Sequence, residues 1–338
     1  MTTTTRIVLA SRPTGEPCDE NFRTETVDLP VPGPGDAVLE TLYLSLDPYM
    51  RGRMSTAKSY ADPVEIGQTM VGGTVSRVLS SDDRSLAEGD IVLGYAGWQS
   101  HSVEPAKGLI KLDPTRAPVS TALGVLGMPG FTAYAGLLTI GQPKPGETVV
   151  VAAASGPVGS AVGQIAKVKG ARAVGIAGGP DKVAFVKDEL GFDEAIDHRA
   201  PDFKEQLAAA TPSGIDVYFE NVGGAVWDAV LPRMNTYGRV PVCGLIANYN
   251  LTELPPGPDR SAALMRQILT RQLTVRGFIQ GQFGSQMRDF LRDMSGWIAD
   301  GSVVYREDVV DGLENTPEAF RGLLIGKNFG KLLIKVAD

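Results

Sequence analysis

The sequence is poor in the residues from which metal sites and disulfides are built. Its 338 residues include two cysteines, Cys18 and Cys243, and two histidines, His101 and His198. Two cysteines so far apart form no disulfide framework, which favours a reducing compartment. A catalytic zinc takes about three protein ligands and a structural zinc four, mostly Cys and His. We therefore expect no metal site and no alcohol oxidation through zinc.

Basic charge and long apolar runs are scarce as well. The formal net charge is −7 and the pI is about 5.1, which argues against broad binding to nucleic acid or anionic membranes. We find no run of about 18 apolar residues that would span a bilayer. The start, MTTTTRIVLASRPTGEP, lacks the apolar core of a signal peptide. These absences predict a cytoplasmic protein.

The first 123 residues have the pattern of short strands. The segment AVLETLYLSLD alternates apolar and polar residues as a half-buried strand does. Further strands are predicted in TMVGGTVSRVLS, DIVLGYAGWQSHSV and GLIKLD, with proline and glycine between them. This pattern predicts a small, irregular β-barrel.

The pattern changes from about residue 124. An apolar helix is expected over 131–140 and a strand over 148–153, after which strands and helices alternate. Such alternation predicts a doubly wound parallel sheet. We expect domains at 1–123 and 124–302, with 303–338 completing the first domain because NFGKLLIKVAD is typical of a strand.

A glycine turn follows the strand at 148–153. Ala154, Gly156 and Gly159 have the spacing of the dinucleotide fingerprint, with alanine at the first glycine position. Gly156 would let the backbone approach a pyrophosphate, and Gly159 would let the helix pack close to the strand. The helix from Pro157 would offer free N–H groups. Glycine turns also join strands to helices that bind nothing, but the strands on both sides favour a dinucleotide.

The end of the next strand lacks an acid. NAD-binding sheets carry a carboxylate there that binds the ribose diol and repels a 2′-phosphate. Here the place holds Ala177, Gly178 and Gly179, and Lys182 follows. This favours NADP(H) over NAD(H), with Lys182 as the positive charge. The alternative is that Lys182 is a solvated residue in the first turn of a helix.

Several segments, in order along the chain, resemble one enzyme family. They are LYLSLDPYMRGRM, GMPGFTAYAGLL, AAASGPVGSAVGQIAK, GPDKVAFVKDELGFDEAID, YFENVGG, CGLIANYN and NFGKLLIKV. They resemble zinc-independent medium-chain dehydrogenase/reductases of the prostaglandin reductase, plant double-bond reductase and bacterial curcumin reductase group. The resemblance implies a GroES-like barrel plus a Rossmann domain. It also implies NADPH-dependent reduction of carbon–carbon double bonds conjugated to a carbonyl, a small-molecule enone or alkenal substrate, and a homodimer.

The resemblance also implies roles for single residues. The cofactor-binding positions are Ser155, Gly156, Pro157, Val158, Gly159, Gly178, Lys182, His198, Asn221, Cys243, Gly244, Ile246, Tyr249, Phe278, Ile279 and Asn328. Tyr49 and Tyr249 match aromatic residues of the substrate cleft, and both are candidates for the catalytic hydroxyl. Arg51 is either an ordinary ion-paired or solvated residue or a group that attracts a carboxylate-bearing substrate.

One position departs from the family. Where this chain has His198, the family often has a tyrosine that helps to bind the 2′-phosphate. His198 would still donate a hydrogen bond, with added charge below its pKa. The alternative is an exposed histidine at the end of a strand. The departure bears on the strength and pH dependence of NADPH binding, and leaves the fold expectation unchanged.

Two other functions compete with the enone reductase. A quinone reductase would share the fold and the cofactor, although DPYMRGRM and CGLIANYN favour the double-bond reductases. A non-catalytic NADPH-binding sensor would bind the cofactor without oxidising it. Serine hydrolysis is not expected, because Ser155 lies outside a G-x-S-x-G frame.

Overall fold

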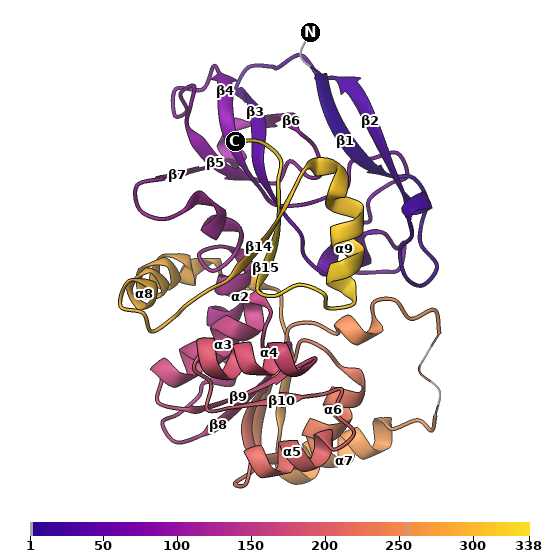
Figure 1. Cartoon of the computed structure of the whole chain (residues 1–338), viewed down its shortest axis with the longest axis vertical. Helices are drawn as coiled ribbons and strands as arrows, with labels where there is room; N and C mark the ends of the chain where they lie inside the picture. Colours follow the sequence, from indigo (N-terminus) through magenta and orange to yellow (C-terminus); the bar gives the residue numbers. More distant parts are fainter. Residues whose placement is uncertain (1–2, 254, 256) are drawn as a thin grey trace. The chain divides into compact units, whose positions relative to one another are not determined.

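The computed structural model describes residues 3–253, 255 and 257–338 (Figure 1). The chain divides into two compact units. The β-rich unit comprises Met1–Gly124 and Glu307–Asp338, and the α/β unit comprises Val125–Arg306. Each is described by itself. In the described part of the chain, no helix has both the length and the apolar character needed to cross a membrane.

The β-rich unit contains two sheets. Strands β1 (Thr3–Leu9) and β2 (Phe22–Asp28) form an antiparallel pair. A seven-stranded sheet has the order β14-β15-β3-β4-β5-β7, with β6 also paired to β3. Its strands are β3 (Asp36–Ser45), β4 (Thr74–Ser81), β5 (Ile91–Gly94), β6 (His101–Pro105), β7 (Ile110–Leu112), β14 (Glu307–Asp311) and β15 (Lys331–Lys335).

The C-terminal strand β15 is an integral part of this sheet. It pairs antiparallel with the end of β3 and parallel with β14, so the C-terminal strand lies in the same sheet as strands from the N-terminal part of the chain (Figure 1). The long strand β3 pairs with β6 near its start and with β15 near its end. The described part of the unit also contains two α-helices, α1 (Tyr49–Arg53) and α9 (Thr316–Leu324).

Aromatic side chains form the centre of one core of this unit. Trp98 stacks on Phe22 with ring centroids 5.5 Å apart, and Phe320 of α9 meets Trp98 edge-on at 5.5 Å. All three rings belong to a cluster of buried residues from β1, α1, α9 and β15. Phe320 of α9 is fully buried in this cluster, so the burial of the apolar face of α9 sets the position of the helix.

The α/β unit is built on a six-stranded sheet. Its order is β10-β9-β8-β11-β12-β13 and every pairing is parallel. The strands are β8 (Thr148–Ala152), β9 (Arg172–Ala177), β10 (Glu194–Asp197), β11 (Ile215–Phe219), β12 (Met234–Val242) and β13 (Thr274–Gly277). In chain order this is 3-2-1-4-5-6, the order of the dinucleotide-binding sheet. The predicted Rossmann fold is confirmed.

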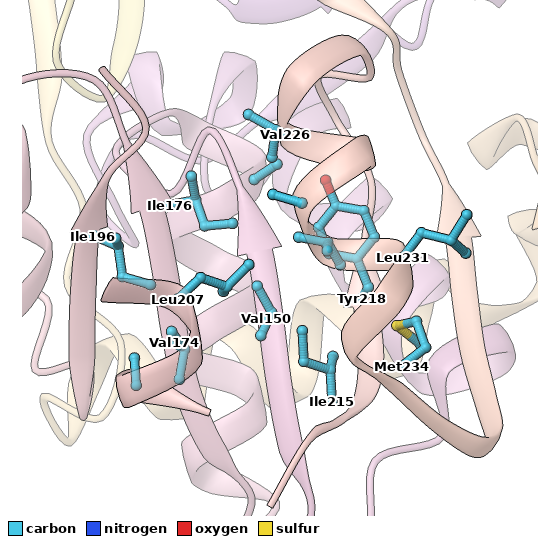
Figure 2. Packing of buried hydrophobic residues seen from close by; sticks show 14 of the residues in the cluster. Val150, Val174, Ile176, Ile196, Leu207, Ile215, Tyr218, Val226, Leu231 and Met234 are labelled. Carbon is cyan, nitrogen blue, oxygen red and sulfur yellow. The ribbon is translucent and has the colours of Figure 1, made fainter. Parts of the chain in front are cut away.

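Helices cover both faces of this sheet. They are α2 (Met128–Ala135, continued by Gly136–Gly141), α3 (Pro157–Val168), α4 (Pro180–Ala184, continued by Phe185–Glu189), α5 (Phe203–Ala210), α6 (Gly224–Val230), α7 (Ser261–Arg271) and α8 (Met287–Ala299). On one face, side chains of α5 and α6 meet Val150, Val174 and Tyr218 (Figure 2). Val149 and Val151 alternate with these along β8 and are equally buried, which is why the strand is apolar throughout.

Candidate functional site

The candidate site lies at the carboxyl ends of β8 and β11. These are the first and fourth strands of the sheet, and they are direct neighbours. The chain order of the strands therefore reverses between them, and ligands of such sheets bind outside the strand ends at this point. The side chain of Asn221, just after β11, donates from Nδ2 to the Ala152 carbonyl at 2.9 Å. This bond joins the loop after β11 to the end of β8.

The backbone of the turn after β8 packs closely against the start of α3. Ala153 adopts a left-handed φ of +53°, and its carbonyl accepts the Gly156 N–H at 3.0 Å. Helix α3 then begins at Pro157, and Ser155 is buried. A Cβ at position 159 would lie 2.3 Å from the Ala153 carbonyl oxygen, so Gly159 permits the close packing of α3 against the turn.

Three basic side chains gather at the turn after β9. Gly179 has a φ of +96°, and Lys182 lies in the short helix that follows. A Cβ at Gly178 would lie 2.9 Å from His198 Nε2 and 3.0 Å from Arg199 Nε. Arg199 escaped the sequence analysis. The only signal for it was its place next to His198 at the end of a predicted strand.

An acid is present near this turn, but it faces the backbone. Asp197 ends β10, and its Oδ1 accepts the N–H groups of Gly179 at 2.9 Å and Arg199 at 2.8 Å. Burial alone would raise the pKa of Asp197, but these bonds and the nearby cations bring it below the usual value. The carboxylate therefore fixes the shape of the turn.

A buried carboxyl group holds the loop after β11. Glu220 is 1% exposed, and its Oε1 accepts Val222 N–H at 2.6 Å, Gly223 N–H at 2.9 Å and the Tyr218 hydroxyl at 3.1 Å. Oε2 has no hydrogen-bond partner among the described residues. Burial raises the pKa of Glu220, although the N–H donors oppose the shift. The sequence analysis did not single out Glu220, because an acid after a strand has many roles.

The same residue connects this loop to the one after β12. The Glu220 carbonyl accepts the N–H groups of Cys243 at 2.9 Å and Gly244 at 3.1 Å, and the Asn221 carbonyl accepts Ile246 N–H at 3.2 Å. Cys243 lies just after β12. Burial raises the pKa of its thiol to about 12, with the charge of Glu220 adding to the shift. The thiol is therefore protonated at neutral pH.

Tyr249 lies in the loop after β12, and Phe278 and Ile279 directly follow β13. The Tyr249 hydroxyl lies over Gly244 and accepts the Leu245 N–H at 3.4 Å. Phe278 is buried edge-on against Phe219, with ring centroids 6.1 Å apart, whereas Ile279 is 40% exposed. The sequence-predicted residues from Ser155 to Ile279 all belong to the α/β unit.

The remaining three predicted residues belong to the β-rich unit. Tyr49 and Arg51 lie in α1, and Asn328 precedes β15 with its Nδ2 donating to the Gly330 carbonyl at 2.9 Å. Burial, and then the charge of Asp47, raises the pKa of Tyr49 well above its usual value. Arg51 is 6% exposed and donates to the Gly15 carbonyl at 2.7 Å, so the expectation of a solvated side chain is wrong.

The described residues contain no group of three or more His, Cys, Asp and Glu side chains able to hold a metal ion.

In the β-rich unit, the side chain of Lys331 is buried and pairs with Asp47 at 2.7 Å. It also donates to the Leu46 carbonyl at 2.7 Å. A buried ammonium group held in this way ties β15 to the loop after β3.

Comparison with known proteins agrees with this fold. Residues 5–112 match a family model described as the N-terminal domain of oxidoreductase, and residues 157–296 match one described as zinc-binding dehydrogenase. The fold and site are those of a dinucleotide-binding oxidoreductase. A quinone oxidoreductase from Pseudomonas syringae, 21% identical with a TM-score of 0.75, shares the fold.

Full-length relatives define the family more narrowly. The NADPH-dependent curcumin reductase of Escherichia coli is 57% identical over 333 residues, covering 98% of this chain and 96% of the relative. The NADP(+)-dependent 2-alkenal reductase of Nicotiana tabacum is 42% identical, with 98% and 97% covered. The crystal structure of CurA in complex with NADPH from Vibrio vulnificus is 55% identical with a TM-score of 0.96, and 99% of each chain is covered. The chain belongs to the zinc-independent medium-chain dehydrogenase/reductases.

Proposed function

We propose that this protein is an NADPH-dependent reductase of carbon–carbon double bonds conjugated to a ketone or aldehyde. The observation that carries the cofactor choice is the turn after β9, where Lys182, His198 and Arg199 gather and the Asp197 carboxylate is bound to backbone N–H groups. The reaction class is supported by full-length relatives that are named curcumin reductase and 2-alkenal reductase.

The residues of the α/β unit fit NADPH. The turn after β8 supplies glycine where a side chain would meet backbone, and helix N-terminal N–H groups point to a pyrophosphate site. We assign Ser155, Gly156, Pro157, Val158 and Gly159 to the pyrophosphate and Gly178, Lys182 and His198 to the 2′-phosphate. Asn221, Cys243, Gly244, Ile246, Tyr249, Phe278 and Ile279 are assigned to the ribose and nicotinamide. Asn328, from the β-rich unit, is assigned to the cofactor as well.

When bound, NADPH supplies the hydride that the β-carbon of the substrate receives. The carbonyl oxygen of the substrate then gains negative charge, which a hydroxyl donor stabilises. We assign this role to Tyr249, because its hydroxyl lies over Gly244 in the loop that Glu220 holds. A tyrosine of ordinary pKa is a weak acid at neutral pH but an effective hydrogen-bond donor.

Tyr49 is the second candidate donor. Its raised pKa keeps the phenol protonated throughout the neutral range, so it holds a proton that can reach the α-carbon of the substrate. Water is the alternative donor. We propose accordingly that the β-rich unit supplies substrate-binding residues and the α/β unit binds the cofactor.

Arg51 remains a predicted substrate residue with a test of its own. Its guanidinium group is largely removed from water, which strengthens attraction for a carboxylate. If Arg51 binds such substrates, R51A will lose the preference for acid-bearing enones and keep turnover of neutral ones. Unchanged preference would reject this role.

A small substrate panel tests the function. Loss of NADPH absorbance would be followed with an alkenal, a linear enone, curcumin and a benzoquinone, each repeated with NADH. Turnover of the enones with NADPH, and little with NADH, is the expected result. Turnover of the quinone alone would make the protein a quinone reductase. Tight NADPH binding without turnover of any substrate would make it a sensor.

We further propose a cytoplasmic homodimer. Strand β13 ends the sheet order, all four of its residues are exposed, and Val275 is 38% exposed there. An exposed sheet edge is suited to pair with a second copy. Both cysteines are free thiols, which fits a reducing compartment. Sedimentation equilibrium should give twice the mass of one chain, and V275P should shift the equilibrium toward monomer.

A further inference from the structure

The turn after β9 places an imidazole and a guanidinium group side by side. A Cβ built at Gly178 would lie 2.9 Å from His198 Nε2 and 3.0 Å from Arg199 Nε, closer than a real Cβ normally approaches, so both groups occupy the space beside Gly178. Both residues follow β10, and the His198 N–H donates to the Ala177 carbonyl at 3.0 Å, which fixes its backbone at the end of β9. The position of the imidazole is therefore set by the sheet.

Three charged groups act on this imidazole. Arg199 lies beside it, Asp197 precedes it, and Lys182 reaches it from α4. The Asp197 carboxylate is already engaged by two backbone N–H groups, so the two cations outweigh it. Partial burial lowers the pKa of His198, and the charge of Arg199 lowers it further. His198 is therefore mainly neutral at pH 7 in the free protein.

A phosphate dianion reverses this balance. A negative group close to an imidazole favours its protonated form, and a protonated imidazole donates from both ring nitrogens. Because Lys182 and Arg199 are already cationic, His198 is the group of this cluster that gains charge near neutral pH. A tyrosine at this position would donate one hydrogen bond and gain no charge.

We propose that the binding of NADPH is coupled to proton uptake at His198, so that the affinity for NADPH, but not for NADH, increases as the pH falls from about 8 to about 6. This inference rests on the proposed NADPH-binding function. The sign follows from linkage: a ligand whose bound state holds more protons than the free state binds more tightly at lower pH. NADH lacks the 2′-phosphate and gives no such coupling.

Isothermal titration calorimetry tests the coupling directly. Titration of the protein with NADPH at pH 7 in two buffers of different ionisation enthalpy measures the protons taken up. We expect a fractional uptake in the wild type, none with NADH, and a clear decrease in H198N. From pH 6 to pH 8 the NADPH Kd should rise roughly fivefold more in the wild type than in H198N. H101N, in strand β6, serves as the matched control and should retain the coupling.

The 2′-phosphate itself has a second pKa near 6, so it also exchanges protons on binding. This contribution is the same in the wild type and in H198N. The difference in proton uptake between them therefore isolates the contribution of the imidazole. If H198N does not fold, H198Y replaces it, because tyrosine keeps a hydrogen-bond donor without a charge that titrates near neutral pH. Equal proton uptake in wild type and variant would overturn the inference. Failure of the wild type to bind NADPH would instead reject the proposed function.

A second readout needs no cofactor. The chain has two histidines, so the imidazole signals of the free protein can be assigned by NMR with H198N. His198 should titrate below the ordinary value of about 6.5, and R199A should move its pKa upward. An ordinary pKa that R199A does not change would contradict the charge balance on which the inference depends.

Discussion

The candidate site of the α/β unit has two ends that are built in different ways. At the turns after β8 and β9, glycine positions decide the geometry, because a side chain at 159 would meet backbone and one at 178 would meet His198 and Arg199. At the loops after β11 and β12, one buried residue, Glu220, holds the first loop through its carboxyl group and the second through its backbone carbonyl. We call these the phosphate end and the loop end.

The difference shows where sequence carries information about a site. Glycine spacing is a local signal, because the close approach of a helix to its preceding turn is determined within a few residues. The hydrogen bonds that the Glu220 carbonyl accepts from Cys243 and Gly244 join segments more than 20 residues apart in the chain, and no local pattern records them. The phosphate end was therefore predicted from motifs, and the loop end through the resemblance alone.

The largest effect is expected at the phosphate end. In G159A the added Cβ lies against the Ala153 carbonyl and carbon and the Ala154 Cα, all of which are backbone and cannot move without shifting the turn. We expect a loss of about 3 kcal/mol in the free energy of unfolding and the loss of NADPH binding. Urea denaturation and fluorescence titration measure the two quantities.

The matched control is a glycine with open space around it. A Cβ at Gly296 of α8 would meet nothing within 4 Å, so G296A should keep full NADPH binding and gain up to about 1 kcal/mol of stability. Wild-type behaviour of G159A would show that the turn tolerates a side chain, and would remove the distinction between the two ends.

At the loop end, the next largest effect concerns the Tyr249 hydroxyl. Removal of an oxyanion donor costs about 2–3 kcal/mol in kcat/KM, near a hundredfold, so Y249F should lose this much activity on enones. Y237F is the control, since Tyr237 is 64% exposed and has no role in the site. Full kcat/KM in Y249F would reject the assignment.

A smaller effect is expected from Glu220. E220A leaves the Val222 and Gly223 N–H groups and the Tyr218 hydroxyl without their buried acceptor, which should cost about 2 kcal/mol in the free energy of unfolding. E220Q keeps an acceptor oxygen and should lose less than E220A. Urea denaturation gives both values, with E205A, at an exposed position of α5, as the control. Equal stability of E220A and wild type would contradict a holding role for this carboxyl group.

The smallest effect returns to the phosphate end. K182A removes one of several basic groups, so the NADPH Kd should rise about tenfold, whereas the NADH Kd should not change. K204A, an exposed lysine of α5, provides the control. Equal losses for the two cofactors in K182A would mean that Lys182 does not contact a 2′-phosphate.

Much of the fold was predictable because its signals are periodic. The alternation of strands and helices predicted the doubly wound parallel sheet, and NFGKLLIKVAD predicted β15. Strands β1, β2 and β14 were not predicted; TETVD of β2 and EDVVD of β14 are polar and carry little alternation. Helix α9 was not predicted either, because it depends on Phe320 reaching a core built from Trp98 and Phe22.

The site was predictable only in part, for a related reason. Gly156, Gly159 and Lys182 follow from spacing, but the neighbourhood of Arg199 and Gly178 requires the parallel register of β10 on β9. The burial of Arg51 could not be predicted, because nothing near it in sequence reveals the Gly15 carbonyl that it contacts. Contacts between distant segments are set by tertiary packing.

The account depends most directly on which bond is reduced and by which cofactor. The decisive measurement is identification by mass spectrometry and NMR of the product formed from one linear enone, with NADPH and NADH compared at equal concentration. The account predicts the saturated ketone, formed rapidly with NADPH and only slowly with NADH. An allylic alcohol as the product, or equal rates with the two cofactors, would contradict it.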